Sequence, residues 1–214
     1  MTEAAVEESE TRRLLVDLAR SLFERGFSVG SAGNISVRLA DGYLMTPTNA
    51  SLGRLEAERL SKLDTRFQHV GGDRPSKEVF MHRAFYAART DAGAVVHLHS
   101  TMATAVACLP DLDPVAPIPP LTPYFVMRVG GKLPVVPYYR PGDPEMEPAI
   151  ADAARDAKAV LLANHGPVVS GRTLLDAVYA AEELEESARL FLLLRGSAVR
   201  LLTRPQIAAL LAES

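Results

Sequence analysis

The segment GSAGNISVRLADGYLM, residues 30–45, narrows the possible folds of this chain more than any other. It begins as a glycine-rich turn and continues as a strand, and residues 42–46 form an antiparallel partner for that strand. Asp41-Gly42, between the two strands, is a strong indication of a two-residue hairpin turn. The hairpin argues against an all-parallel sheet.

Helical segments flank this hairpin in the sequence. Residues 9–26 are predicted to form an amphipathic helix from the spacing of their apolar residues, with Ser9 as its N-cap and Gly26 as its end. Further helices are expected at 76–89, 100–108, 144–157 and 173–195, and further strands at 94–99, 159–163 and 167–171. Hairpins interleaved with helices predict an α/β fold in which helices cover both sides of a sheet.

The composition is that of an ordinary globular protein, with 48% hydrophobic and 23% charged residues among 214. This length fits a single domain spanning residues 1–214. The net charge of -3 gives no reason to expect nucleic acid or a membrane as a partner. The acid-rich N-terminus has no apolar signal-peptide core, and no run of about 18 apolar residues occurs, so a cytoplasmic location is expected.

Three histidines indicate a metal site. His97 and His99 lie at the end of an apolar strand, and residues two apart on a strand point to the same side. His165, in the sequence NHGP, follows a second apolar strand, so one sheet can bring all three imidazoles together. Zinc accepts imidazole nitrogens, and three protein ligands leave a position open for chemistry. The alternative is that these are satisfied polar residues at strand ends.

Metal-binding β-barrels of the cupin type also carry an H-x-H pair, but there an acidic ligand follows within a few residues. No acidic residue lies between His99 and Asp111 here, and the carboxylate best placed in sequence, Glu78, precedes the pair on a helix. His82, four residues after Glu78 and so on the same helix face, is expected to be an ordinary helix histidine, with a supporting contact to the site as the alternative. His69 is expected to be an exposed loop residue.

Three short segments have the residues of an anion-binding site. Residues 30–34 are glycine-rich and end in Asn34, whose amide can donate to an oxygen. Residues 46–49, TPTN, include Thr48 and Asn49. Residues 75–78, PSKE, place Ser76 and Lys77 at a predicted helix start, where free backbone N–H groups favour an anion.

Together these motifs resemble the class II aldolase and adducin family: Glu78 on a helix, His97-x-His99, His165 in NHG, and the segments GNIS and TPTN. The resemblance covers nearly the whole chain. It implies an α/β/α sandwich around a central, largely antiparallel sheet with helices on both faces. It also implies a homo-oligomer, usually a C4 tetramer, with active sites at subunit interfaces.

Residue by residue, the resemblance implies zinc, or another divalent metal, held by His97, His99 and His165. Glu78 matches both the catalytic acid/base and a fourth, displaceable ligand. The positions that match the family's phosphate site, or lie beside it, are Asn34, Thr48, Asn49, Ser76 and Lys77. Tyr124, in LTPYFVMRVG, matches a tyrosine that reaches the site of a neighbouring subunit.

Two departures distinguish this chain from the family's sugar-phosphate aldolases, which typically read T-P-[ST]-G and P-S-S-E where this chain has TPTN and PSKE. With VVHLHST and PYYRPGDP, these segments resemble the family's 3-oxo-tetronate 4-phosphate decarboxylases. That resemblance implies loss of CO2 from a phosphorylated sugar acid through a zinc-stabilised enediolate, giving dihydroxyacetone phosphate in four-carbon sugar acid catabolism. Whether Lys77 binds the phosphate or the carboxylate is left open.

Other functions are compatible with the same motifs. One is a class II aldolase that cleaves a ketose 1-phosphate of the fuculose-phosphate type, or a related sugar-phosphate dehydratase. Another is a non-catalytic, adducin-like interaction module. The presence of all three histidines and Glu78 argues against the second of these.

Overall fold

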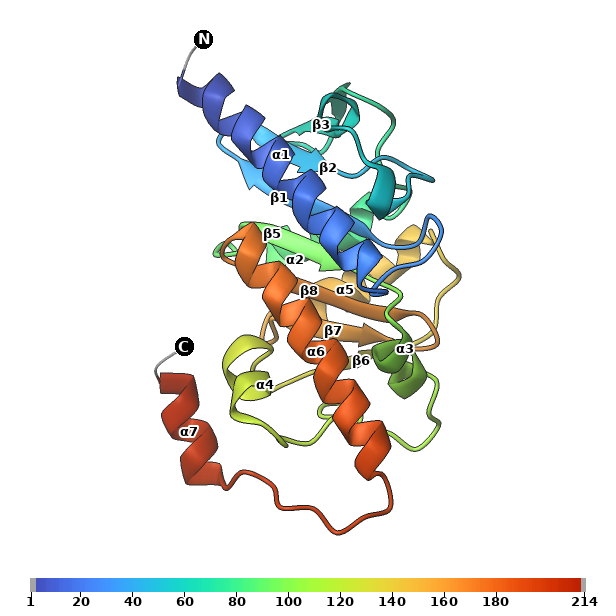
Figure 1. Ribbon diagram of the computed structural model, residues 1–214, viewed down its shortest axis with the longest axis vertical. Helices are drawn as coiled ribbons and strands as arrows, with labels where there is room; N and C mark the ends of the chain where they lie inside the picture. Colours follow the sequence, from blue (N-terminus) through green and yellow to red (C-terminus); the bar gives the residue numbers. More distant parts are fainter. Residues whose placement is uncertain (1–2, 213–214) are drawn as a thin grey trace.

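The computed structural model describes residues 3–212, and one eight-stranded sheet forms its centre (Figure 1). In sheet order the strands are β4 (His69–Gly71), β3 (Ser61–Asp64), β2 (Gly42–Met45), β1 (Asn34–Leu39), β5 (Ala94–His97), β8 (Gly166–Gly171), β7 (Ala159–Leu162) and β6 (Val135–Val136). Neighbouring strands are antiparallel except β6 and β7, which run parallel. The largely antiparallel sheet predicted from the hairpin and the resemblance is confirmed.

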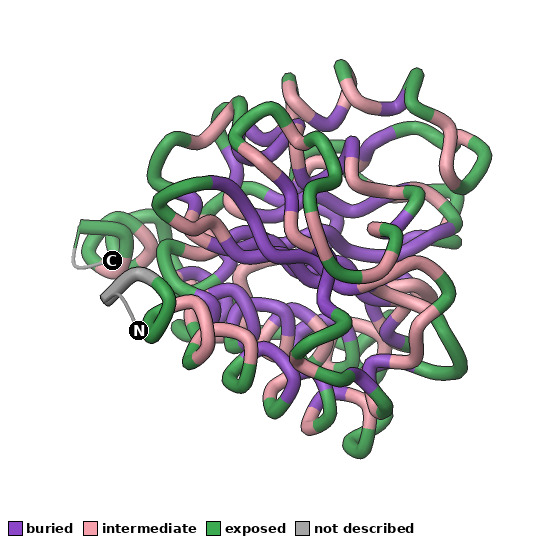
Figure 2. Tube along the Cα trace, turned by 90° about the horizontal axis from the view of Figure 1, so that it is seen from above, coloured by how far each residue is buried: buried purple, intermediate pink, exposed green. Residues whose placement is uncertain are grey.

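Helices cover both faces of the sheet, as predicted (Figure 1). One core packs beneath α1 (Glu3–Glu24), α3 (Thr101–Ala107), α4 (Pro123–Arg128) and α6 (Leu174–Leu194). A second core packs beneath α2 (Val79–Ala88) and α5 (Glu147–Ala154) on the other face. Short helices η1 (Leu52–Arg54), η2 (Ala57–Arg59) and η3 (Pro144–Met146) lie in connections, and α7 (Arg204–Ala212) packs on α4. Figure 2 shows the buried chain between outer layers that are more exposed.

Because side chains alternate along a strand, the two faces of the sheet carry different kinds of side chain. In β1, Ile35 and Val37 join the core beneath α1 and α6. The alternate residues Asn34 and Ser36 are also buried, but their side chains make hydrogen bonds with residues at or near α2. In β5, Val95 packs in the α2 core, so His97, two residues later, emerges on that same face. Polar side chains of neighbouring strands therefore meet beneath α2.

Two predicted helix starts are wrong. The first helix begins at Glu3, six residues before Ser9, because the preceding alanines and glutamates are good helix formers. It ends near Gly26 as predicted, where Phe27 N donates to Leu22 O. The second helix begins at Val79, with Glu78 as its N-cap residue, because the chain before it is held in a β-bridge between Pro75 and Pro47 and by the hydrogen bond from Ser76 N to Thr46 O.

The remaining elements follow the pattern closely, with short additions. The hairpin is present, but the predicted turn Asp41-Gly42 is wrong by one residue: Leu39 pairs with Gly42, which begins β2, so the turn residues are Ala40 and Asp41. Strands β4 and β6 have three and two residues, too few for a periodic pattern. Residues 109–145 contain many prolines, which cannot continue a helix, and accordingly form α4, β6, the start of η3 and irregular chain. In the described part of the chain, no helix combines the length and apolarity needed to cross a membrane.

Candidate metal centre

Four side chains from three parts of the chain converge at one end of β5. His97 is the last residue of β5, and His99 follows two residues later. His165 lies in the turn between β7 and β8, and Glu78 occupies the N-cap position of α2. One ligand atom from each lies within 4.8 Å of every other. The Nε2 atoms of His97 and His99 are 3.0 Å apart, and those of His99 and His165 are 3.1 Å apart. The predicted grouping of three histidines and Glu78 is present.

The backbone conformation of the turn between β7 and β8 brings His165 to the other three residues. Asn164 has a φ of 58°, a left-handed conformation that asparagine tolerates better than most residues. Gly166 has a φ of 147°, and a Cβ added there would lie 2.5 Å from Leu98 O. The flanking residues of the NHG motif therefore let the β7–β8 turn approach the segment that follows β5.

A hydrogen bond fixes the orientation and tautomer of the His97 ring. Its Nδ1 donates to Pro167 O at 2.9 Å, so a neutral His97 carries a lone pair on Nε2, facing the cluster. Burial and the neighbouring imidazoles lower the pKa of His97, which is fully buried. Burial, with His165 nearby, lowers the pKa of His99 to about 4, and burial also lowers the pKa of His165. These imidazoles are therefore neutral at pH 7.

This donor set fits a divalent cation. Neutral imidazole nitrogens and one carboxylate are the ligands that zinc and similar ions take in proteins. The Glu78 carboxylate lies 3.7 Å from His97 Nε2 through Oε2 and 3.6 Å from His165 Nε2 through Oε1. Without a cation, nitrogen lone pairs and a carboxylate would face one another across the cluster. The four residues form a metal-binding cluster.

The predicted phosphate residues and the cluster share one cavity of 260 Å³. Its lining includes every residue predicted to hold phosphate, together with Glu78 and His99; the phosphate residues are Asn34, Thr48, Asn49, Ser76 and Lys77. Backbone hydrogen bonds join two of the three segments: Thr48 N donates to Arg74 O at 2.9 Å, and Ser76 N to Thr46 O at 3.3 Å. Lys77 makes no ion pair within the described residues, so its ammonium group is available to a ligand.

Asn49 has a conformational reason to be asparagine. Its φ is 56°, in the left-handed region that glycine occupies freely and that asparagine tolerates. The aldolase pattern has glycine at this place, so the exchange keeps the same backbone turn. Asn49 is therefore weaker evidence for a different substrate than Lys77.

The prediction for His82 is wrong. The side chain is fully buried, with Nδ1 2.7 Å from Ser36 Oγ and Nε2 2.5 Å from Asn34 Oδ1. Asn34 Nδ2 in turn donates to Glu78 Oε2 at 2.8 Å. The spacing of Glu78 and His82 placed both on one helix face, but their strand partners were needed to find the contact. His69 is exposed as expected, although it begins β4.

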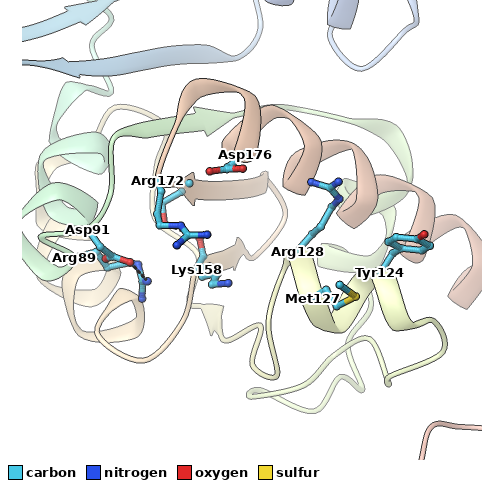
Figure 3. Close-up of a pocket in the computed structure, with 10 residues that line it drawn as sticks. Arg89, Asp91, Tyr124, Met127, Arg128, Lys158, Arg172 and Asp176 are labelled. Carbon is cyan, nitrogen blue, oxygen red and sulfur yellow. Dashed lines mark hydrogen bonds and ion pairs between the residues drawn. The ribbon is translucent and has the colours of Figure 1, made fainter. Parts of the chain in front are cut away.

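Tyr124 does not reach the metal-binding cluster of its own chain. It lies on α4 with its side chain 61% exposed, beside a cavity of 360 Å³ that Gly171 also lines (Figure 3). Gly171 ends β8, and Gly166, next to His165, begins it. At about 3.3 Å per residue, β8 separates these two places by roughly 16 Å. Within one chain, Tyr124 therefore lines a different cavity from the one that Glu78 and His99 line.

Comparisons with known proteins agree with this geometry. The sequence-family model named Class II Aldolase and Adducin N-terminal domain matches residues 13–192. A 3-oxo-tetronate 4-phosphate decarboxylase of Haemophilus influenzae is 53% identical over 197 residues, covering 92% of this chain and 93% of that protein. An L-fuculose phosphate aldolase of Escherichia coli is 35% identical, covering 87% and 85%.

The solved structure of YgbL from Escherichia coli has a TM-score of 0.92 and 47% identity, covering 95% of this chain and 99% of that one. The matched model spans most of the sequence, and the relatives align over nearly the full length of both chains. The chain therefore belongs to the class II aldolase and adducin family.

Proposed function

We propose that this chain is a metal-dependent lyase that converts 3-oxo-tetronate 4-phosphate to dihydroxyacetone phosphate and CO2. The observation that carries the proposal is the shared cavity, in which Lys77 and the polar residues around it adjoin a cluster of three histidines and Glu78. The 53% identical relative, whose name states this reaction, supports the choice of substrate.

The substrate is a β-keto acid, so loss of C1 as CO2 leaves a pair of electrons shared over C2 and C3. A divalent cation, which we propose to be zinc, would be held by His97, His99 and His165, with Glu78 as a displaceable fourth ligand. It would supply stabilisation of negative charge on oxygen. The reaction needs no base at its start. It needs a proton at C2 after CO2 leaves.

Glu78 is placed to give or relay that proton. Its carboxyl group lines the cavity and also contacts the histidine cluster, so one side chain borders both substrate and metal. A positioned acid of this kind contributes about 10²- to 10⁴-fold to rate. In this proposal Glu78 acts mainly in the second half of the reaction.

The anionic groups of the substrate are bound by the other lining residues. Thr48, Ser76 and the second N–H of the Asn34 amide can donate to oxygens, and the ammonium group of Lys77 supplies positive charge. A substrate with both a phosphate and a carboxylate has more charge to neutralise than a ketose 1-phosphate. Lys77 therefore favours the decarboxylase over the aldolase, whichever group it binds.

The substrate is tested by measuring two products from the same metal-loaded protein. With 3-oxo-tetronate 4-phosphate we expect CO2 and dihydroxyacetone phosphate in equal amounts. With a ketose 1-phosphate such as fuculose 1-phosphate we expect aldehyde release at least about tenfold slower, a difference of roughly 1.4 kcal/mol in the barrier. The aldolase alternative rests on the 35% identical relative, and rapid aldehyde release without CO2 would establish it instead.

We also propose that the chain works as a homo-oligomer, a C4 tetramer, in which Tyr124 completes the site of a neighbour. The exposed position of Tyr124, and its place in a different cavity from the one that Glu78 lines, support this. Tyr124→Phe should lower turnover about 10- to 100-fold, the worth of one hydrogen bond to a charged group, without loss of metal. Tyr179→Phe, which keeps the ring that packs under Arg128, is the matched control.

The assembly itself is measured by light scattering, with an expected mass four times the 23.1 kDa of one chain. A monomer with full turnover, or a Tyr124→Phe variant as active as the Tyr179→Phe control, contradicts the proposal.

A further inference from the structure

Two rows of polar residues with nearly equal spacing face each other behind the cavity. On the helix side, Glu78, His82 and Tyr86 are four residues apart, about 6 Å per step at 1.5 Å per residue. On β1, Asn34 and Ser36 are two residues apart, about 6.6 Å per step. The rows interleave, so each strand residue contacts two members of the helix row.

The contacts form one continuous chain of hydrogen bonds. From the far end, the Tyr86 hydroxyl lies 2.9 Å from Ser36 Oγ, which lies 2.7 Å from His82 Nδ1. His82 Nε2 lies 2.5 Å from Asn34 Oδ1, and Asn34 Nδ2 lies 2.8 Å from Glu78 Oε2. Its three middle members are at most 3% exposed, which limits competition from water.

The donor and acceptor properties of the groups give this chain of hydrogen bonds a single donor-to-acceptor direction. An ionised Glu78 only accepts hydrogen bonds, so the Asn34 amide nitrogen faces it and the amide oxygen faces His82. That oxygen only accepts, so His82 Nε2 carries the hydrogen. Burial lowers the pKa of His82 to about 3, so the ring is neutral and Nδ1 accepts from Ser36. Ser36 then accepts from Tyr86, and every donor points toward Glu78.

On this geometry we propose that His82 is a positioning residue: its Nε2–H holds the Asn34 amide in the one orientation that donates to Glu78 Oε2. The proposal rests on the proposed role of Glu78. If the amide flipped, its oxygen would face the carboxylate and two acceptors would be in contact. With Oε2 fixed, Oε1 accepts no side-chain hydrogen bond within residues 3–212, and it is the oxygen left to transfer a proton.

Three substitutions at His82 separate the two ring nitrogens. The side-chain amide of glutamine can place a donor near the position of Nε2, whereas the shorter asparagine reaches only the position of Nδ1, and leucine supplies neither. We expect His82→Leu and His82→Asn to lower kcat about 10- to 100-fold, as removal of partners that orient metal-site residues commonly does. KM and bound metal should stay within about twofold, and His82→Gln should recover most of kcat.

If His82 had a purely structural role, the three variants would differ in another way. The substitutions would lower the thermal stability of all three variants and reduce kcat in proportion to the fraction unfolded, with no recovery in His82→Gln. Equal kcat values in the three folded variants, or a loss expressed only in KM, would overturn the proposal.

A spectroscopic measurement tests the hydrogen position without any turnover. In metal-loaded protein labelled with ¹⁵N-histidine, the His82 ring, identified by its absence in His82→Gln, should be the neutral Nε2–H tautomer. An Nδ1–H tautomer or a protonated ring would overturn the proposal. Failure of the proposed function is distinguishable, because it would appear as a wild-type protein that releases no CO2 while the tautomer is unchanged.

Discussion

Replacing His97 by alanine is expected to abolish metal binding and turnover together. His97 supplies an Nε2 lone pair to the cluster, and the hydrogen bond from its Nδ1 to Pro167 O holds the ring in place. Charge stabilisation by a bound cation is worth several kcal/mol. At about 1.4 kcal/mol per factor of ten, kcat/KM should fall by roughly 10³-fold or more.

The measurement is metal per chain by elemental analysis, together with kcat/KM on the same samples, purified without chelator. Wild-type protein should hold about one equivalent and His97→Ala close to none. The matched control is His69→Ala, because His69 is an exposed histidine on an edge strand, outside the cluster. Since His97 is buried, circular dichroism must show that the variant is folded. A folded variant that keeps metal and turnover would refute the assignment.

Glu78→Gln is expected to preserve the fold and slow turnover by about 10²- to 10⁴-fold. The amide has the shape of the carboxyl group but cannot supply a proton at C2. Its oxygen can still face the Asn34 amide, so the buried chain behind it is not broken. Part of the bound metal should remain, because three imidazoles are unchanged.

The assay follows CO2 and dihydroxyacetone phosphate separately, since Glu78 is assigned to the step after CO2 leaves. Reaction in D2O adds a second readout: wild-type enzyme should deliver deuterium to one face of C2, and the variant should lose that preference. Glu145→Gln, at an exposed glutamate that does not line the cavity, is the control. Near-normal turnover in Glu78→Gln would show that another group delivers the proton.

The parts of the site that follow from local pattern were predictable. The H-x-H pair, the NHG turn and the apolar strands before them placed three imidazoles together, and the structure has that grouping. The alternation of side chains along a strand accounts for His97 but not for His99, because β5 ends at His97 and His99 lies beyond it. Pairing of β5 with β8 and the glycine at 166 complete the approach.

Other features depended on contacts that no local pattern contains. His82 looks like any helix histidine until its partners on β1 are known, and those partners are 46 and 48 residues away. The sequence pattern predicts α2 to begin three residues early because it contains no sign of the bridge between Pro75 and Pro47, which lie 28 positions apart. In the sequence, Asn49 points to a different substrate, whereas its φ of 56° gives a backbone reason for the residue.

One face of β1 packs in a core and the other supports the reactive groups, and this difference bears on how the enzyme can be engineered. Ile35 and Val37 point into the core beneath α1 and α6, and their neighbours Asn34 and Ser36 point to the hydrogen-bonded chain behind Glu78. Substitutions that improve packing beneath α1 and α6 can raise heat tolerance while leaving the reactive groups in place. Engineering for a new substrate would instead concentrate on the loops around the cavity. Thermal stability and substrate selectivity can thus be changed separately in this chain.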